Sequence, residues 1–585
     1  GMWSLEMTER QNMANKEASA NNTLTETGNW RLNWQWTNTA TYTKKIHEDH
    51  NITVVLGTEA IKQGVGRYMQ GTRIDYIFES DPNTWTLDNG SSSNIGNSSR
   101  YQRKVTMFGL FGRADYSYKG KYLATFTIRR DASSKFGSKN RWGNFPSASL
   151  GWRMSDEKFM EPTRKWLDDF KLRAGYGTTG NSNIGSYNYA FQYGTGNYYM
   201  YPITGSDSET SPGYVLSNLG DSDAKWETTK MFNIGFDLTA LSNRLTAGFD
   251  FYVKNTSDLL VPANWSALVG NASKPSINIG DMKNRGIDLS IGWRDKVGEF
   301  GYNITANISR YKNEVTRLGS SDLFNDTRLS KVNITTVGQP VGMFYGYQID
   351  GIYQNEQDVI SSGVLPYGVA TENDLVASAW VGRYKMKDVN NDGKIDADDR
   401  TIIGNPHPDL TGGFNISLTW RDFDLSTYMY YSIGNDLYKH YEYYTMFGNL
   451  QSNYSKDRLA KSWDPVNNPN GIYPLWTTTS TEGPEAGNES NSNYVQDGSY
   501  LRMQTLTLGY SLPKKLLKKI GFEKIRVYGQ ISNVFTITGY DGLDPEVRSH
   551  TSFENEYVSS DMNKGIDYGS YGMPRQFLMG VNVTF

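Results

Sequence analysis

The sequence of 585 residues contains no cysteine and only five histidines. Without cysteine there is no disulfide framework, no thiolate metal site and no thiol catalysis. The histidines form no pair at metal-binding spacing. Long hydrophobic runs are also missing, since the mean hydropathy is −0.60 and no stretch approaches the roughly 18 to 20 apolar residues of a membrane helix. The sequence therefore excludes a helical membrane protein.

The chain also lacks a strong charge of either sign. It has 59 basic and 62 acidic residues, a net charge of −3, so no global field favours nucleic acid or anionic lipid. No nucleophile elbow, Walker loop or dinucleotide fingerprint occurs in the required strand–turn–helix context. We expect neither an enzyme nor a nucleic-acid-binding protein.

Aromatic residues are abundant instead. The chain holds 40 Tyr, 24 Phe and 15 Trp, which is 14% of all residues, while hydrophobic residues reach only 37%. Soluble domains usually carry roughly 45 to 50% apolar residues. A transmembrane β-barrel combines an apolar outer face, a polar lumen and aromatic girdles at both interfaces. The composition favours that architecture.

Apolar and polar residues alternate with a period of two in many segments, as expected for half-apolar strands. Clear examples are residues 30–36, 122–129, 244–254, 302–309 and 577–585. The polar side of one of them, formed by Asn303, Thr305, Asn307 and Ser309, fits a hydrated lumen. Periodicity alone leaves a soluble β-sandwich or propeller open, because their strands alternate in the same way.

Connection lengths favour the barrel. Short turns are expected at residues 45–49, 119–120, 240–243, 296–298 and 421–422. Long polar connections lie between them, at residues 63–99, 178–225, 255–283, 313–412, 435–499 and 536–573. Outer-membrane barrels have short periplasmic turns and long extracellular loops. We therefore predict an all-β, transmembrane antiparallel up-and-down β-barrel of roughly 16 strands, with the C-terminus on the periplasmic side.

An ordered succession of sequence blocks resembles one family. The blocks are TIRRDASSKFG at 127–137, WGNFPS at 142–147, KLRAGYG at 171–177, KWETT at 225–229, NRGID at 284–288, DGSYLR at 497–502 and GLDPE at 542–546. They resemble the barrel region of the SusC/RagA-type TonB-dependent outer-membrane transporters of Bacteroidetes. The resemblance covers nearly the whole chain.

The resemblance implies that residues 1–585 are the C-terminal barrel region of such a transporter. We find no counterpart of the family's signal peptide, TonB-contacting segment or plug domain, and large transporters have about 22 strands. We therefore expect an incomplete barrel, and interpret the chain as a fragment.

The implied function is nutrient import across the outer membrane, of oligosaccharides or, in some members, peptides. The implied partners are a SusD-type surface lipoprotein, TonB and outer-membrane lipid. Two alternatives remain open, a passive outer-membrane porin and a calcium-stabilised extracellular carbohydrate-binding β-protein.

Residues 388–399, DVNNDGKIDADD, fit an EF-hand-like loop. Such loops place oxygen ligands at fixed positions around Ca²⁺, with glycine at the sharp turn, here Gly393. The candidate ligands are Asp388, Asn390, Asp392, the Lys394 carbonyl, Asp396 and Asp399. Asp399 stands where Glu is usual, and its shorter side chain implies weaker ligation. The alternative is a solvated Asn-Asp-Gly turn.

Tyrosines crowd two of the long connections, at Tyr193, Tyr198, Tyr199, Tyr201, Tyr438, Tyr441, Tyr443 and Tyr444. Sugar rings have apolar faces that pack on aromatic rings, so these side chains could line a glycan route. An aromatic girdle or ordinary loop packing explains them equally well. The sequence identifies no substrate-binding residue.

Overall fold

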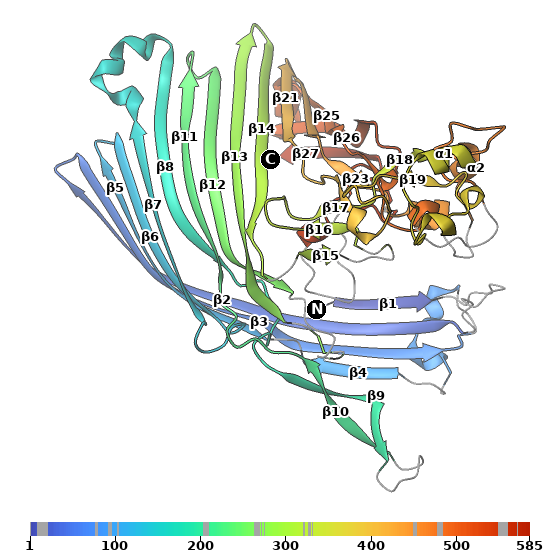
Figure 1. Ribbon diagram of the computed structural model, residues 1–585. Helices are drawn as coiled ribbons and strands as arrows, with labels where there is room; N and C mark the ends of the chain where they lie inside the picture. Colours follow the sequence, from blue (N-terminus) through green and yellow to red (C-terminus); the bar gives the residue numbers. More distant parts are fainter. Residues whose placement is uncertain are drawn as a thin grey trace.

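Figure 1 shows the computed structural model of the chain. It describes residues 2–8, 21–76, 80–91, 96–101, 104–202, 210–262, 270, 272–273, 275–319, 322–325, 329, 331–447, 453–476, 484–547, 560–569 and 571–585. No helix among these residues is long and apolar enough to cross a membrane.

One antiparallel sheet of 17 strands dominates the structure. Its strands are β1 (Met2–Thr8), β2 (Thr23–Ile46), β3 (His50–Ile74), β4 (Gly96–Tyr101), β5 (Val105–Tyr118), β6 (Tyr122–Ser133), β7 (Trp142–Arg153), β8 (Leu167–Asn181), β11 (Glu227–Ala240), β12 (Leu245–Pro262), β13 (Ser276–Val297), β14 (Phe300–Arg317), β21 (Leu410–Trp420), β22 (Phe423–Ile433), β25 (Tyr500–Ser511), β26 (Lys524–Thr538) and β27 (Gln576–Thr584). Each long strand pairs with its neighbours in sequence, which confirms the predicted meander.

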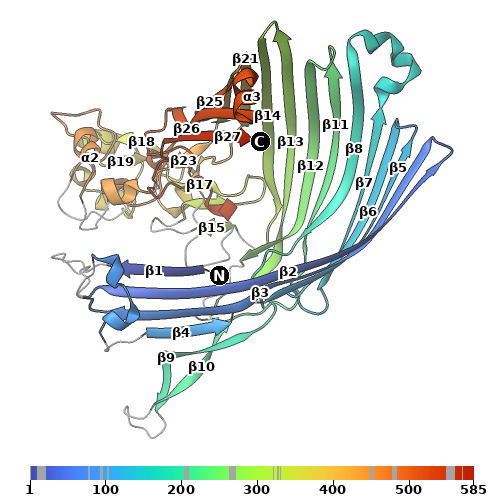
Figure 2. The same ribbon diagram turned by 180° about the vertical axis from the view of Figure 1, so that it is seen from behind.

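The sheet curves strongly but is open among the described residues. β1 pairs only with β2, and β27 pairs only with β26. The β2–β3 hairpin is longer than the rest of the sheet, and the short strands β1 and β4 pair with the part that extends past β5 (Figures 1 and 2). The prediction of an incomplete barrel is confirmed.

The register places an apolar face on one side of the sheet. Opposite residues on neighbouring strands form ladders, such as Phe236, Phe249 and Leu289 on β11, β12 and β13. Large apolar side chains on this side are widely exposed, including Ile291 at 44% and Phe126 at 52%. We call this side the outward face and the opposite, polar side the inward face.

The long connections carry their own elements. Their strands are β9 (Gln192–Pro202), β10 (Thr210–Asn218), β15 (Leu323–Asn325), β16 (Asn333–Thr335), β17 (Met343–Gly346), β18 (Ile349–Ile352), β19 (Tyr384–Met386), β20 (Thr401–Gly404), β23 (Asp436–Tyr438) and β24 (Val495–Asp497). The α-helices are α1 (Glu356–Ser361), α2 (Lys456–Lys461) and, on a short connection, α3 (Lys514–Ile520). Short 3₁₀ or π turns are η1 (Pro82–Thr84), η2 (Leu87–Asn89), η3 (Met154–Asp156), η4 (Lys158–Lys165), η6 (Glu372–Asp374), η7 (Ala377–Ala379), η8 (Ala397–Asp399), η9 (Tyr443–Phe447), η10 (Pro484–Ala486), η11 (Ser492–Tyr494) and η12 (Ser560–Asn563).

The main hydrophobic core lies in these connections rather than in the sheet. Three of them, after β14, β22 and β26, pack together into one unit that we call the loop cluster (Figure 1). Its buried residues are Leu329, Val332, Phe344, Tyr347, Ile352, Tyr384, Met386, Ile395, Tyr438, Met446, Phe447, Trp463, Tyr473, Tyr494 and Ile566. A single folded unit therefore stands at the long-loop end of the strands.

Candidate functional site

The inward face is a lattice of ion pairs that join neighbouring strands. Arg173 on β8 is the clearest case. Its Nη1 and Nη2 lie 2.6 and 2.8 Å from the Asp250 carboxylate on β12, and its Nε lies 3.1 Å from Oδ2 of Asp237 on β11. One guanidinium thus ties three strands together. The charge of Arg173 is matched by carboxylates that the chain itself supplies.

Two further arginines follow the same rule. On β6, Arg129 donates to Asp131 at 2.8 Å and also contacts Glu59 on β3. On β26, Arg526 donates to Asp424 on β22 at 2.8 Å from Nε. Such charge-assisted hydrogen bonds are stronger than neutral ones, and the Arg526 pair is also bidentate, through Nε and Nη2. The inward face is polar and hydrogen-bonded, as a water-filled barrel requires.

The polar residues predicted to face a lumen do lie on the inward face. Asn303, Thr305, Asn307 and Ser309 alternate along β14 with outward apolar side chains. Ser309 donates to the inward Asp288 on β13. The three others are exposed along β14, so with Asp288 on β13 the polar surface covers two neighbouring strands.

The tyrosine-rich loops are mostly packing elements. Tyr438 is fully buried, stacks on Tyr494 with ring centroids 5.2 Å apart, and shares a 3.1 Å hydrogen bond with Ser490. The predicted Tyr441, Tyr443 and Tyr444 are partly buried beside it. Loop packing therefore accounts for Tyr438.

The other predicted tyrosines lie on β9. Tyr193 is 68% exposed, whereas the side chains of Tyr198, Tyr199 and Tyr201 lie outside the described residues. Among the predicted tyrosines whose side chains the structure describes, Tyr193 is the exposed one and is a candidate for contact with a solute.

The loop cluster also buries charges that sequence reasoning missed. Lys439 Nζ lies 2.6 Å from Glu442 Oε1, and both side chains are more than nine-tenths buried. Burial raises the pKa of Glu442, which the Lys439 ammonium counteracts. Burial lowers the pKa of His440 to about 4 and raises that of Glu485 to about 7. No sequence signal marks these groups, because long-range packing creates their burial.

The predicted calcium loop folds around its own backbone. Asp388 accepts hydrogen bonds from the Asn391 and Gly393 N–H groups at 2.7 and 2.8 Å, and Gly393 has φ = +83°. Asn390 accepts from the Asp392 N–H at 2.9 Å. Within the described ranges, no group of three or more His, Cys, Asp or Glu side chains is arranged to hold a metal ion.

The far half of this loop binds its own lysine and backbone. Lys394 Nζ lies 2.6 Å from Asp396 Oδ2, and this contact lowers the pKa of Asp396. The buried Asp399 carboxylate accepts from the Val389 and Asp396 N–H groups at 2.9 and 2.8 Å. Both carboxylates are therefore occupied by donors of the loop itself. Calcium binding stays a prediction.

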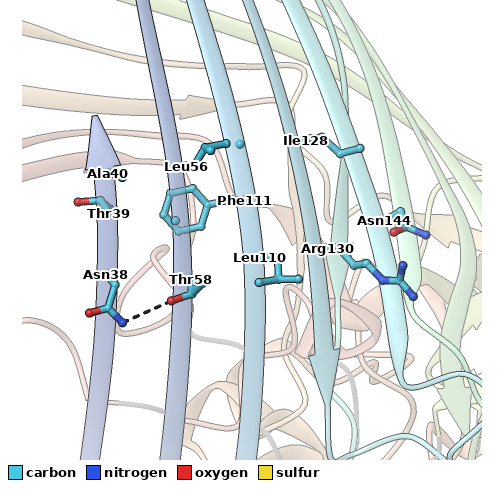
Figure 3. Close-up of a pocket in the computed structure, with 12 residues that line it drawn as sticks. Asn38, Thr39, Ala40, Leu56, Thr58, Leu110, Phe111, Ile128, Arg130 and Asn144 are labelled. Atoms are coloured by element: carbon cyan, nitrogen blue, oxygen red, sulfur yellow. Dashed lines mark hydrogen bonds between the residues drawn. The ribbon is translucent and has the colours of Figure 1, made fainter. Parts of the chain in front are cut away.

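A shallow hollow of about 780 Å³ lies on the outward face (Figure 3). It is lined by Asn38, Thr39, Ala40, Leu56, Gly57, Thr58, Leu110, Phe111, Gly112, Ile128, Arg130 and Asn144. The Asn38 amide donates to Thr58 at 3.4 Å. Arg130 stands across from Leu110 and packs over the Trp142 ring at 5.0 Å. Because most of these side chains share the apolar face, the hollow is not part of the polar inward surface.

An open, curved antiparallel sheet with an apolar outward face and an ion-paired inward face is the wall of a membrane barrel. The model of the family "TonB dependent receptor-like, beta-barrel" matches residues 3–534. The chain therefore belongs to the TonB-dependent receptor β-barrel family, a class of outer-membrane receptors and transporters rather than enzymes.

Similar proteins agree with this assignment. TonB-dependent receptor P3 of Formosa agariphila is 34% identical over 83% of this chain and 46% of its own length. TonB-dependent receptor SusC of Bacteroides thetaiotaomicron is 32% identical over 83% of this chain and 44% of its own length. The solved RagAB peptide transporter has the same fold, with a TM-score of 0.78, 24% identity and coverage of 100% of this chain and 58% of that one. The chain spans about half the length of the curated relatives it matches.

Proposed function

We propose that this chain is the barrel wall of a TonB-dependent importer that takes up a bulky polar nutrient, an oligosaccharide, across the outer membrane. TonB supplies the energy, and a SusD-type surface lipoprotein captures the substrate outside. The polar, ion-paired inward face beneath a folded loop cluster carries this proposal.

The inward face suits a hydrated solute. Arg129, Arg173 and Arg526 on this face are neutralised by carboxylates, so a neutral, hydroxyl-rich molecule meets donors and acceptors there without a strong net field. An exposed aromatic such as Tyr193 offers a surface for a sugar ring, at about 0.5 to 1.5 kcal/mol per aromatic contact. Contacts this weak guide a glycan but do not retain it, which supports the need for an external partner.

The open sheet favours an energised transporter over a passive channel. The bilayer cannot satisfy the free backbone groups along β2 beyond its pairing with β1, nor those of β27, because a membrane sheet must close on itself. We propose that further strands of a longer protein close the barrel, and that a plug fills it. A barrel of about 22 strands is wide enough to leak small solutes unless it is plugged.

Uptake measurements test this proposal. The gene is deleted and, separately, the proton gradient is dissipated, while uptake of a panel of oligosaccharides and peptides is followed. Both treatments should abolish uptake of an oligosaccharide. If only peptide uptake is lost and oligosaccharide uptake survives, the substrate is a peptide and not an oligosaccharide. Survival of all uptake, with free conductance of the purified protein in a planar bilayer, would establish a passive porin instead.

We further propose that the 388–399 loop binds Ca²⁺ through Asp388, Asn390, Asp392, Asp396, Asp399 and the Lys394 carbonyl. The side-chain oxygens of Asp388 and Asn390 support this proposal, because they turn toward the backbone of the loop itself. The Lys394 ammonium also supports it, since its 2.6 Å contact with Asp396 shows that the carboxylates of the loop attract a cation. Calcium would displace that ammonium. A weak site, with Kd of about 10⁻⁴ to 10⁻³ M, suits the extracellular side.

Calorimetric titration checks the calcium proposal. After chelation, the wild type should bind Ca²⁺ saturably, and Asp388→Ala should abolish the signal because it removes the first ligand of the loop. Asp374→Ala is a matched control, since Asp374 is an exposed carboxylate on the same connection that accepts from Thr371 outside the motif. Equal binding by wild type and Asp388→Ala would refute the assignment.

A further inference from the structure

Three cations meet on the outward face at the loop-side ends of β13 and β14. Arg285 and Lys312 are directly opposite each other in the register, and Arg310 lies on the adjacent ladder, opposite Ile287. All three side chains are exposed. Opposite positions in a sheet bring side chains to about 4.5 to 5.5 Å, so like charges placed there destabilise the pairing. An anion between the cations would relieve this repulsion.

The chain does not supply that anion. Among the described residues, none of the three cations has a carboxylate within ion-pair distance. Glu314 faces Lys283 on the next ladder. This contrasts with the inward arginines such as Arg173, which are paired with carboxylates. It also contrasts with the short-turn end of β13, where Asp295 contacts Arg244 of the turn before β12 at 3.1 Å.

The cations stand at one end of an apolar stripe. Towards the short turn, the column below Arg285 continues with Ile287, Leu289 and Ile291, and the column below Arg310 continues with Ile308. These isoleucines are 36 to 44% exposed. Arg285 is twelve residues from Val297 at the short turn, and tilted strands rise about 30 Å over that length. The three cations therefore lie where the hydrocarbon core ends on the long-loop side.

We propose that Arg285, Arg310 and Lys312 bind the phosphate headgroup of a lipid in the leaflet on the long-loop side, with an acyl chain along the isoleucine stripe below. Guanidinium groups bind phosphate through two parallel hydrogen bonds, and a nearby ammonium adds a point charge. The apolar stripe favours a lipid over free phosphate, because the same molecule satisfies the cations and covers exposed hydrocarbon. The site is separate from the inward surface and does not rest on the import proposal.

Native mass spectrometry of the purified protein in detergent micelles tests this site. The micelles are titrated with dioleoyl phosphatidic acid, with phosphatidylcholine of the same chains, and with inorganic phosphate. The wild type should retain phosphatidic acid preferentially. Arg285→Gln or Lys312→Gln should weaken its binding about fivefold, and the double variant about thirtyfold, while phosphatidylcholine binding stays unchanged.

A matched double variant, Arg294→Gln with Lys296→Gln, removes two charges from the short-turn end of β13 and should leave phosphatidic acid binding unchanged.

Lys312→Glu places a carboxylate opposite Arg285. It should abolish selective lipid binding yet raise the melting temperature in lipid-free detergent. Equal phosphatidic acid binding by wild type and the Arg285/Lys312 double variant would overturn the proposal. Equal binding of inorganic phosphate and phosphatidic acid would overturn it too. So would a double variant that still binds phosphatidic acid but loses a protein that co-purifies with the wild type, because the cations would then bind that protein.

Discussion

Phe344→Ala should destabilise the loop cluster by about 3 to 5 kcal/mol and leave the sheet intact. Phe344 is fully buried where three connections meet. Its ring lies 5.6 Å from that of Tyr438, and it closely approaches Gly565, where an added Cβ would stand 2.9 Å from the ring. Truncation of the Phe344 side chain leaves a cavity between three separate connections, which cannot all move inward to fill it. Hydrogen exchange of the cluster and of the sheet, measured in one experiment, separates the two regions.

A surface control identifies the cause. Ile360 in α1 is 58% exposed on the same connection, and Ile360→Ala should change stability by no more than about 0.5 kcal/mol. If Phe344→Ala accelerates exchange in the strands as much as in the loops, the cluster is not a separate folded unit. If neither region responds, the core assignment is wrong.

Glu485→Gln should stabilise the loop cluster at pH 8, by up to about 3 to 4 kcal/mol, and have little effect near pH 4. Burial raises the pKa of Glu485 to about 7 in the folded protein, against about 4.3 in an unfolded chain. Between about pH 4.3 and 7, Glu485 is therefore protonated in the folded protein and ionised in the unfolded chain. Its contribution to the free energy of unfolding is fully present below about pH 4.3 and is lost as the pH rises through about 7.

Denaturant unfolding of both proteins between pH 4 and 8 measures this effect. Glutamine keeps an oxygen that can accept the 2.5 Å hydrogen bond from the Tyr367 N–H, so the hydrogen bond survives the substitution. His440, with its pKa lowered to about 4, acts in the opposite direction, but it is present in both proteins and cancels in their difference. A difference that does not vary with pH would show that Glu485 is not buried as described.

The sheet was predictable because the strands of a membrane barrel alternate apolar and polar residues, one set for each face of the sheet. The turns at 240–243 and 296–298 match the ends of β11 and β13, since short turns interrupt a strong period-two pattern. The predicted long connection at 255–283 was too long, however. β12 continues to Pro262 and β13 already begins at Ser276. Beyond the bilayer a strand needs no apolar face, so the alternation fades while the backbone pairing continues.

The loop cluster was not predictable in the same way. Phe344, Tyr438 and Ile566 come from three connections with no common periodicity, and only the folded structure brings them together. The Lys439–Glu442 pair and the buried Glu485 depend on that packing. The outward cations were likewise hidden, because Arg285 and Lys312 become opposite only through the strand register.

Site-directed spin labelling tests the assignment of the two faces most directly. Because the chain has no cysteine, a single cysteine can be introduced at each position from Asn303 to Ile308 without a background label. In lipid bilayers, labels at Ile304, Ala306 and Ile308 should be most accessible to oxygen, and labels at Asn303, Thr305 and Asn307 to a water-soluble nickel chelate. Accessibility without a period of two, or with the two faces reversed, would contradict a barrel wall with its polar face inward.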